Sequence, residues 1–336
     1  MEKPTSRLNI LTEKEVGPAL ASKWLIDVLT RTYGHHNLMA SIVQTEQDIR
    51  SGRLCPFFKL EEGKLACACA LIKSEKTIEI GRAANLPGKK GGGHLMQDAI
   101  STWDENIEET RPLVAEIRMA GPFEEIAGGQ GSQATLLSKV GMIPHAFLPA
   151  FHHPGPHGPD RQELFCFTSS EKLARPVTQI APKSIFLPDL PGINLELLKN
   201  FLEINKYDTV INLVNPDRAT LTIGLKRIAS KPFNLFVVDP EGRAISPDSF
   251  IEGKSSPFDL VVVNSFSNDL PKIATDLIAS GFIISGISSP HEGSLQLLFG
   301  RLRECILAPT LPISTFPFIE TKLIMDLHRQ FETKKL

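Results

Sequence analysis

A cluster of glycines between a strand-like run and a helix-like run constrains this chain more than any other feature. Thr77–Asn85 has the composition of a β-strand, Gly88–Gly93 contains four glycines, and His94–Ile107 has helical periodicity. The first N–H groups of a helix lack partners within it and lie at the positive end of its dipole. Glycines let the backbone approach an anion closely. This order predicts a phosphate site, with Lys89 and Lys90 adding positive charge at its rim.

Two other kinds of phosphate loop fail on particular residues. A Walker-type loop needs Gly-x4-Gly-Lys-Ser/Thr, but Lys90 follows Gly88-Lys89, and Ala83 stands where the first glycine is required. A dinucleotide fingerprint needs Gly-x-Gly-x-x-Gly, and Met96 stands at its third glycine. A flexible glycine hinge without a ligand remains the alternative.

Helical and strand-like runs alternate over the first 170 residues. The predicted elements are helices at Gly17–Leu29 and Ile42–Ser51, strands at Pro56–Leu60, Leu65–Lys73 and Thr77–Asn85, a helix at His94–Ile107, a strand at Val114–Met119, a helix at Gln133–Val140, and strands at Ile143–Phe151 and Glu163–Thr168. Glu61-Glu62-Gly63 is a hairpin turn by composition. This order predicts an α/β (α+β) fold with a mixed, largely antiparallel sheet and flanking helices.

A second α/β block follows a stretch rich in charge and proline near 169–182. At 336 residues the chain exceeds the usual size of a single core. We predict one domain over 1–170, a linker over 171–182, a second domain over 183–318, and a C-terminal helix within 319–336. Both blocks contain a glycine followed by an apolar residue before a strand, at Gly141 and Gly281, which suggests that the two domains are related.

Composition excludes several classes of function. The 36 basic and 38 acidic residues give a net charge of −2, which argues against nucleic acid as the partner. No apolar run is long enough for a transmembrane helix, and the N-terminus lacks a signal core. The five cysteines have no zinc or disulfide spacing, so we expect buried, reduced thiols and a cytoplasmic protein. His152, His153 and His157 lie in a proline- and glycine-rich stretch, and we expect a solvated loop there rather than a metal site.

The glycine cluster and its flanks resemble motif A of the GNAT acyltransferase superfamily. The resemblance rests on the run Glu79–Met96, in which Gly91 and Gly93 match the two small positions and Met96 the apolar anchor of the helix. The run Ser132–Pro144 resembles the family's second cofactor-side helix. Residues 183–300 resemble, more weakly, the degenerate second domain of two-domain members.

The resemblance implies coenzyme A as the ligand, carried as acetyl-CoA or another acyl-CoA. In the family, a strand opened by a bulge leads into the glycine loop. The pantetheine arm is then expected along the backbone of Ala83–Asn85, and the pyrophosphate on Lys90–His94. The residues implied in cofactor binding are Ala83, Ala84, Asn85, Gly88, Lys89, Lys90, Gly91, Gly92, Gly93, His94, Ser132 and Gln133.

The activity implied is transfer of an acyl group, most simply acetyl, to an amine of a small molecule or peptide. An amine with a pKa of about 10.4 is neutral only about once in 2,500 molecules at pH 7, so a general base assists the attack. The candidate bases are Glu79, Glu116, and either His35 or His36, with Glu79 preferred because its strand faces the acyl end of the cofactor in the family.

Two departures from the family pattern keep a second function open. Gly88 stands where the family has Gln or Arg, and Leu137 where many members have the tyrosine that protonates the leaving thiolate. The alternative is therefore a non-catalytic module that binds coenzyme A or acts as a scaffold. A homodimer is possible, and neither a nucleic acid nor a membrane is expected as partner.

Overall fold

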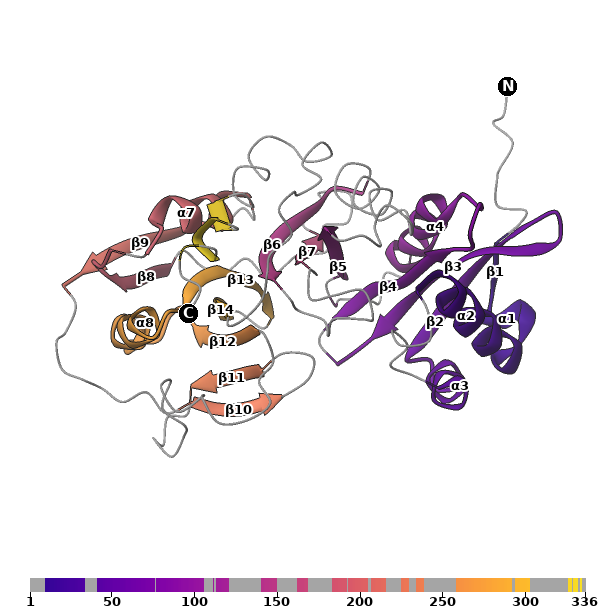
Figure 1. The fold of residues 1–336 in the computed structure, drawn as a ribbon, viewed down its shortest axis with the longest axis horizontal. Coiled ribbons are helices and arrows are strands. Elements are labelled where there is room, and N and C mark those ends of the chain that lie inside the picture. The colour runs from indigo at the N-terminus through magenta and orange to yellow at the C-terminus, as the bar shows by residue number, and fades with distance from the viewer. Residues whose placement is uncertain are drawn as a thin grey trace, which may run out of the picture. The chain divides into compact units, whose positions relative to one another are not determined.

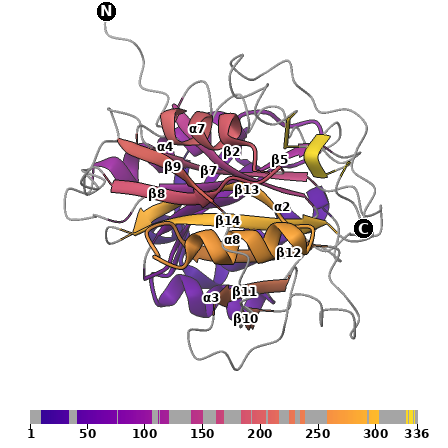
Figure 2. The ribbon, with the colours of Figure 1, turned by 90° about the vertical axis from the view of Figure 1, so that its left-hand side faces the viewer.

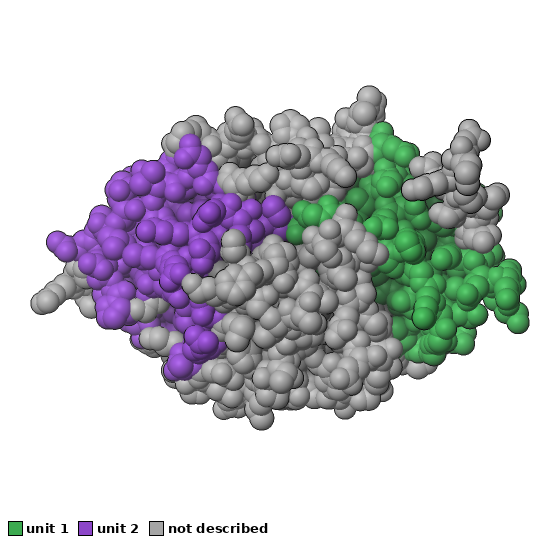
Figure 3. All heavy atoms as spheres, turned by 90° about the horizontal axis from the view of Figure 1, so that it is seen from above, with its two compact units in different colours: residues 1–118, 122–142, 170–175 green, residues 119–121, 143–169, 176–336 purple. Residues whose placement is uncertain are grey.

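The computed structural model describes most of the two predicted blocks. The described residues are 10–33, 41–75, 77–105, 111, 113–120, 140–149, 162–168, 183–191, 193–204, 207–215, 225–229, 234–238, 258–291, 294–302, 326–327, 329–331 and 333. The chain forms two compact units, coloured separately in Figure 3. Unit 1 comprises residues 1–118, 122–142 and 170–175, and unit 2 comprises residues 119–121, 143–169 and 176–336. The predicted linker 171–182 and the boundary at 318 lie outside the described residues, so the domain boundaries stay a prediction.

Unit 1 is an α/β unit built on strands in the order β1-β2-β3-β4-β5 (Figure 1). The elements in chain order are β1 (Ile10–Thr12), α1 (Glu13–Val16), α2 (Pro18–Tyr33), α3 (Ile42–Arg50), β2 (Leu54–Glu61), β3 (Lys64–Lys73), β4 (Ile78–Asn85), α4 (Gly92–Asp104) and β5 (Leu113–Ala120). Strands β1 to β4 pair antiparallel, whereas β4 and β5 pair parallel. The predicted mixed, largely antiparallel sheet is confirmed.

The hairpin between β2 and β3 closes as its turn residues predict. Glu61 pairs with Lys64, so the loop consists of Glu62 and Gly63 alone. Both have positive φ, at 53° and 73°. A two-residue turn with positive φ at both positions matches the twist of the strands, and glycine adopts it without a steric penalty.

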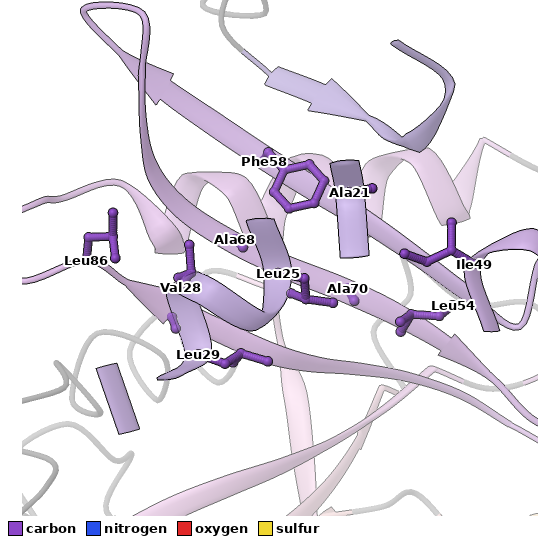
Figure 4. Packing of buried hydrophobic residues seen from close by; sticks show 11 residues of the cluster. Ala21, Leu25, Val28, Leu29, Ile49, Leu54, Phe58, Ala68, Ala70 and Leu86 are labelled. Carbon is purple, nitrogen blue, oxygen red and sulfur yellow. The ribbon is translucent and has the colours of Figure 1, made fainter. Parts of the chain in front are cut away.

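One face of the unit 1 sheet is covered by α2 and α3. Residues of α2, namely Ala21, Leu25, Val28 and Leu29, lie over β3 near Ala68 and Ala70 (Figure 4). Trp24 meets Phe58 edge-on, with ring centroids 5.4 Å apart. This apolar core positions β4 rigidly, because Ala84 and Leu86 at the end of that strand belong to it.

The other face is covered by α4. Its buried residues are Leu95, Met96, Ala99, Ile100 and Trp103, which recur with the helical period expected for His94–Ile107. Cys67 and Cys69 alternate with the alanines of β3, so both point to the α4 side, and both are fully buried. Burial raises the pKa of Cys67 to about 11. It also raises the pKa of Cys69 well above the usual value of a thiol. The prediction of buried thiols is confirmed for these two residues.

Unit 2 is also an α/β unit. Its larger sheet has the order β7-β6-β13-β14-β12-β11-β10, and β8 and β9 form a separate parallel pair. The elements are β6 (Met142–Pro149), β7 (Gln162–Thr168), β8 (Lys183–Pro188), α7 (Leu195–Ile204), β9 (Thr209–Val214), β10 (Leu225–Ala229), β11 (Asn234–Val238), β12 (Phe258–Asn264), α8 (Leu270–Ala279), β13 (Ile283–His291) and β14 (Ser294–Leu302). Helix α8 packs against β8, and the β8–β9 pair lies between α7 and α8 (Figures 1 and 2).

Strand β13 comes unusually close to β6 at one glycine. Gly286 pairs with Ala146, and a Cβ at Gly286 would lie 2.5 Å from the Ala146 Cα and against the His145 carbonyl oxygen. Only a residue without a side chain allows this approach of two backbones.

We expect Gly286→Ala to lower the free energy of unfolding by about 1–3 kcal/mol, the usual cost of overpacking a core. Urea denaturation followed by circular dichroism measures it. Gly52→Ala is the matched control, because Gly52 also has a positive φ, at 72°, but a Cβ added there would meet no atom within 4 Å. Equal destabilisation by the two variants would contradict a close approach at Gly286.

Candidate functional site

Strand β4 carries a β-bulge near its end. On β3, Ala70 pairs with Gly81 and Ala68 with Ala84, so Arg82 and Ala83 together oppose Cys69. Arg82 has a φ of 52°, a left-handed conformation that residues with a side chain rarely adopt. Bulges bend a strand and redirect its side chains, and such strain concentrates at functional sites. The bulge that the resemblance implied is present.

Strands β4 and β5 pair only at their beginnings. The ladder joins Ile78 to Leu113 and Glu79 to Val114, although β4 runs on to Asn85. Among the described residues no β4–β5 pair follows Glu79. The part of β4 that contains the bulge is therefore beside an opening in the sheet, where an extended ligand can pair with its backbone as an added strand.

The glycine loop brings the end of β4 to the start of α4. The side-chain oxygen of Asn85 accepts a hydrogen bond from the Gly92 N–H at 2.9 Å. The backbone carbonyl of Asn85 accepts one from the Thr32 hydroxyl at 2.8 Å. Gly91 is the N-cap residue, with a φ of 116°, and as a glycine it has no side chain of its own to cap the helix. The next N–H groups, at Gly93 and His94, are those that a capping side chain normally satisfies. An anionic ligand can take that place.

Lys59 belongs to β2, but its side chain lies beside the glycine loop. Its Nζ lies against the position that a Cβ on Gly91 would take, with its Cδ and Cε at 3.1 and 3.2 Å from that position. Lys59 pairs with Cys67, which in turn pairs with Asn85, so one row across three strands ends at the loop. The sequence alone does not predict that Lys59 lies beside the loop, because this position depends on the pairing register of β2, β3 and β4.

The two predicted lysines of the loop differ in their surroundings. Lys89 forms an ion pair with Glu61 at 2.8 Å, which raises the pKa of Lys89 and lowers that of Glu61. Lys90 is exposed. The structure thus adds Lys59 to the cations around the start of α4 and gives Lys89 a carboxylate neighbour.

The two predicted strand carboxylates share one face of the sheet. A Cβ on Gly81 would lie 2.6 Å from the Glu79 Oε1, so the Glu79 side chain runs along β4 toward the bulge. Glu79 pairs with Val114, and Glu116 follows two residues later on β5. Alternation of side chains along a strand therefore puts Glu79 and Glu116 on the same face, on opposite sides of the opening.

The other predicted site residues are placed differently or lie outside the described residues. Ala84 is buried in the core, so only its backbone can meet a ligand. His35, Ser132 and Gln133 lie outside the described residues, as do Leu137 and the histidines of 152–157. In the described part of the chain, no group of three His, Cys, Asp or Glu side chains is arranged to hold a metal ion, and no described helix is long and apolar enough to span a membrane.

Comparison with known proteins gives structural likenesses alone. No family model and no curated protein matches the chain. Among solved structures, a ribosomal-protein-alanine N-acetyltransferase from Brucella melitensis aligns over 48% of this chain and 99% of its own, with 17% identity and a TM-score of 0.36. An N-acetyltransferase from Staphylococcus aureus Mu50 aligns over 47% and 94%, with 16% identity and a TM-score of 0.35. An aminoglycoside 6'-N-acetyltransferase from Enterococcus faecium aligns over 48% and 96%, with 11% identity and a TM-score of 0.34.

Proposed function

We propose that unit 1 is a GNAT-type module that binds an acyl-CoA and transfers its acyl group to an amine. The observation that carries this proposal is the combination at the end of β4. A bulged strand beside an opening in the sheet leads directly into a glycine-rich helix start whose N-cap residue has no side chain. The first part suits an extended arm, and the second suits phosphate.

The residues around the loop fit coenzyme A in shape and charge. The N-cap position at Gly91 has no side chain, so it leaves the N–H groups of Gly93 and His94 for a pyrophosphate, with the Lys59 ammonium beside them. The backbone of Arg82–Asn85 is the edge along which the pantetheine arm would lie. Asn85 holds β4 and α4 together through Gly92, so the two parts of the site keep their spacing.

The bound cofactor would supply an acyl group activated as a thioester, from which an amide and a free thiol result. The chain's own part is to orient the acceptor and to remove a proton from its nitrogen. Glu79 is suited to this because its carboxylate extends over Gly81 toward the bulge. Gly81 provides the room, since any side chain there would displace the carboxylate.

A binding module without catalysis is the second candidate. It is favoured by Gly88, which stands where the family has Gln or Arg and adopts a φ of 76°. Both candidates are expected to bind coenzyme A, but only the enzyme is expected to release the thiol of acetyl-CoA in the presence of an amine. Calorimetry with coenzyme A, followed by a thiol-release assay with acetyl-CoA over a panel of amines, separates them. Binding with thiol release supports the enzyme, binding without release on any amine supports the module, and absence of binding contradicts both.

We expect Glu79→Gln to lower kcat/KM by about 100-fold or more, because a positioned base contributes about 10²- to 10⁴-fold. The dissociation constant of coenzyme A should stay within about threefold, since the amide keeps the size of the carboxylate and the loop is untouched. Steady-state thiol release and calorimetry measure the two. Glu116→Gln is the matched comparison. A larger loss in that variant than in Glu79→Gln would assign the base to Glu116.

A further inference from the structure

The proposed function assigns no role to the guanidinium of Arg82, which lies at the bulge of β4. The Nη1 atom is buried and has no hydrogen-bond partner. Burial lowers the pKa of Arg82, while Asp48 and Glu79 raise it and Arg53 lowers it. Glu79 pairs with Ile72, which packs against the core that contains Ile49 of α3, so Glu79 lies on the α3 side of the sheet. The influence of Asp48 and Glu79 on Arg82 fits a guanidinium on that side as well.

A second buried polar group lies on the same side. Helix α3 buries Thr45, Asp48 and Ile49, which are three and four residues apart and therefore form one face. Thr45 is completely buried, and its hydroxyl has no hydrogen-bond partner. We call Thr45, Asp48, Glu79 and Arg82 the bulge cluster. A buried polar atom without a partner is unfavourable, so two in one cluster call for an explanation such as a ligand.

The charges of the bulge cluster define what such a ligand carries. Asp48 accepts hydrogen bonds from Gln44, at 2.9 Å, and from Arg53, so Arg53 balances its charge, whereas the Nη1 of Arg82 has no partner. Glu79 attracts an amine and Arg82 attracts a carboxylate. The Glu79 carboxylate lies over Gly81, the residue next to Arg82. A ligand that binds both side chains therefore has its amine and its carboxylate only a few bonds apart.

We propose that the acceptor is a free α-amino acid, with its amine on Glu79 and its carboxylate on Arg82. This inference rests on the proposed function and narrows it. Peptide termini, protein lysines and amino sugars have no carboxylate beside the reacting amine and would leave the Nη1 of Arg82 without a hydrogen-bond partner. Arg82 is then a specificity-determining residue, placed at the bulge of β4.

The test uses the full chain and pairs of acceptors that differ in one group. Each L-amino acid is compared with its carboxamide, which keeps the amine and the shape but loses the charge. We expect at least one amino acid to exceed its carboxamide by about 100-fold or more in kcat/KM, because a site built for a polar group rejects analogues that lack it. In Arg82→Met, this ratio should fall to within about threefold of unity. Arg53→Met is the matched control, since Arg53 also neighbours Asp48 but its side chain is 57% exposed, and the ratio should persist there.

Binding measurements keep the inference separate from the proposed function. Calorimetry with the amino acid and its carboxamide needs no turnover and is made on the native chain and on Arg82→Met. A preference for the acid that depends on Arg82 supports the inference, even in a chain that releases no thiol. Amine acylation with equal use of acid and carboxamide would overturn the inference and leave the proposed function standing. Loss of both acceptors alike in Arg82→Met would show that Arg82 only holds the fold, which also overturns it.

Discussion

Replacing Gly91 by valine is expected to weaken coenzyme A binding by about 100-fold or more, because charge-assisted hydrogen bonds contribute about 1.5–3 kcal/mol each and the pyrophosphate would lose several. Gly91 has a φ of 116°, which a β-branched residue does not adopt without strain. Its new side chain would also occupy the place of the Lys59 ammonium. One substitution therefore disturbs the helix start and removes the neighbouring cation. Calorimetry of coenzyme A binding measures the loss.

Two comparisons separate these effects from general unfolding. Gly52→Val places valine at another positive φ, 72°, where no atom lies within 4 Å of the new Cβ, and coenzyme A affinity should be unchanged. Lys59→Met leaves the loop backbone intact and should weaken binding by about tenfold, with a shallower dependence on salt, because one charge interaction is lost. Retained affinity in Gly91→Val would show that the phosphates bind elsewhere.

The parts of the fold that were predictable from sequence are those set by local pattern. The α4 core residues follow helical periodicity, and Glu62-Gly63 is a turn by composition, so both appear in the structure as expected. Strand β1 and helix α1 were missed because each is too short to show a period, with three and four residues. Strand β9 shows no regular alternation of buried and exposed residues, and its Val210 and Leu213 are exposed, so its sequence lacks the pattern of a half-buried strand.

The candidate site shows the same division between local and non-local information. The glycine loop is contiguous in sequence, so the hypothesis of an anion site there follows from the sequence alone. The positions of Lys59 and Arg82 beside it were not predictable, because they depend on strand register and on a bulge that shifts it by one residue. A side chain changes face when the register slips by one, and sequence alone does not give the register.

Unit 2 contains a buried ion pair whose disruption should cost the most stability. Asp259 and Arg301 face each other across β12 and β14, and the Arg301 Nη2 donates to the Asp259 Oδ2 at 2.9 Å. Their side chains are 0% and 7% exposed. Arg301 also donates to the Ser280 carbonyl at 3.0 Å and lies 4.5 Å from the centre of the Phe282 ring. Arg301 therefore joins β14 to β12 and to the segment between α8 and β13.

We expect Arg301→Met to lower the free energy of unfolding by about 3–5 kcal/mol, because it leaves a buried carboxylate without its counter-charge. Urea denaturation followed by circular dichroism measures the change. Asp259→Leu/Arg301→Met is the matched variant, since it removes both charges and keeps the apolar volume. It should recover more than half of the loss, because an uncompensated charge costs more than the pair contributes. A double variant as unstable as the single one would mean that the contacts of Arg301 to Ser280 and Phe282 carry the stability instead of its charge balance.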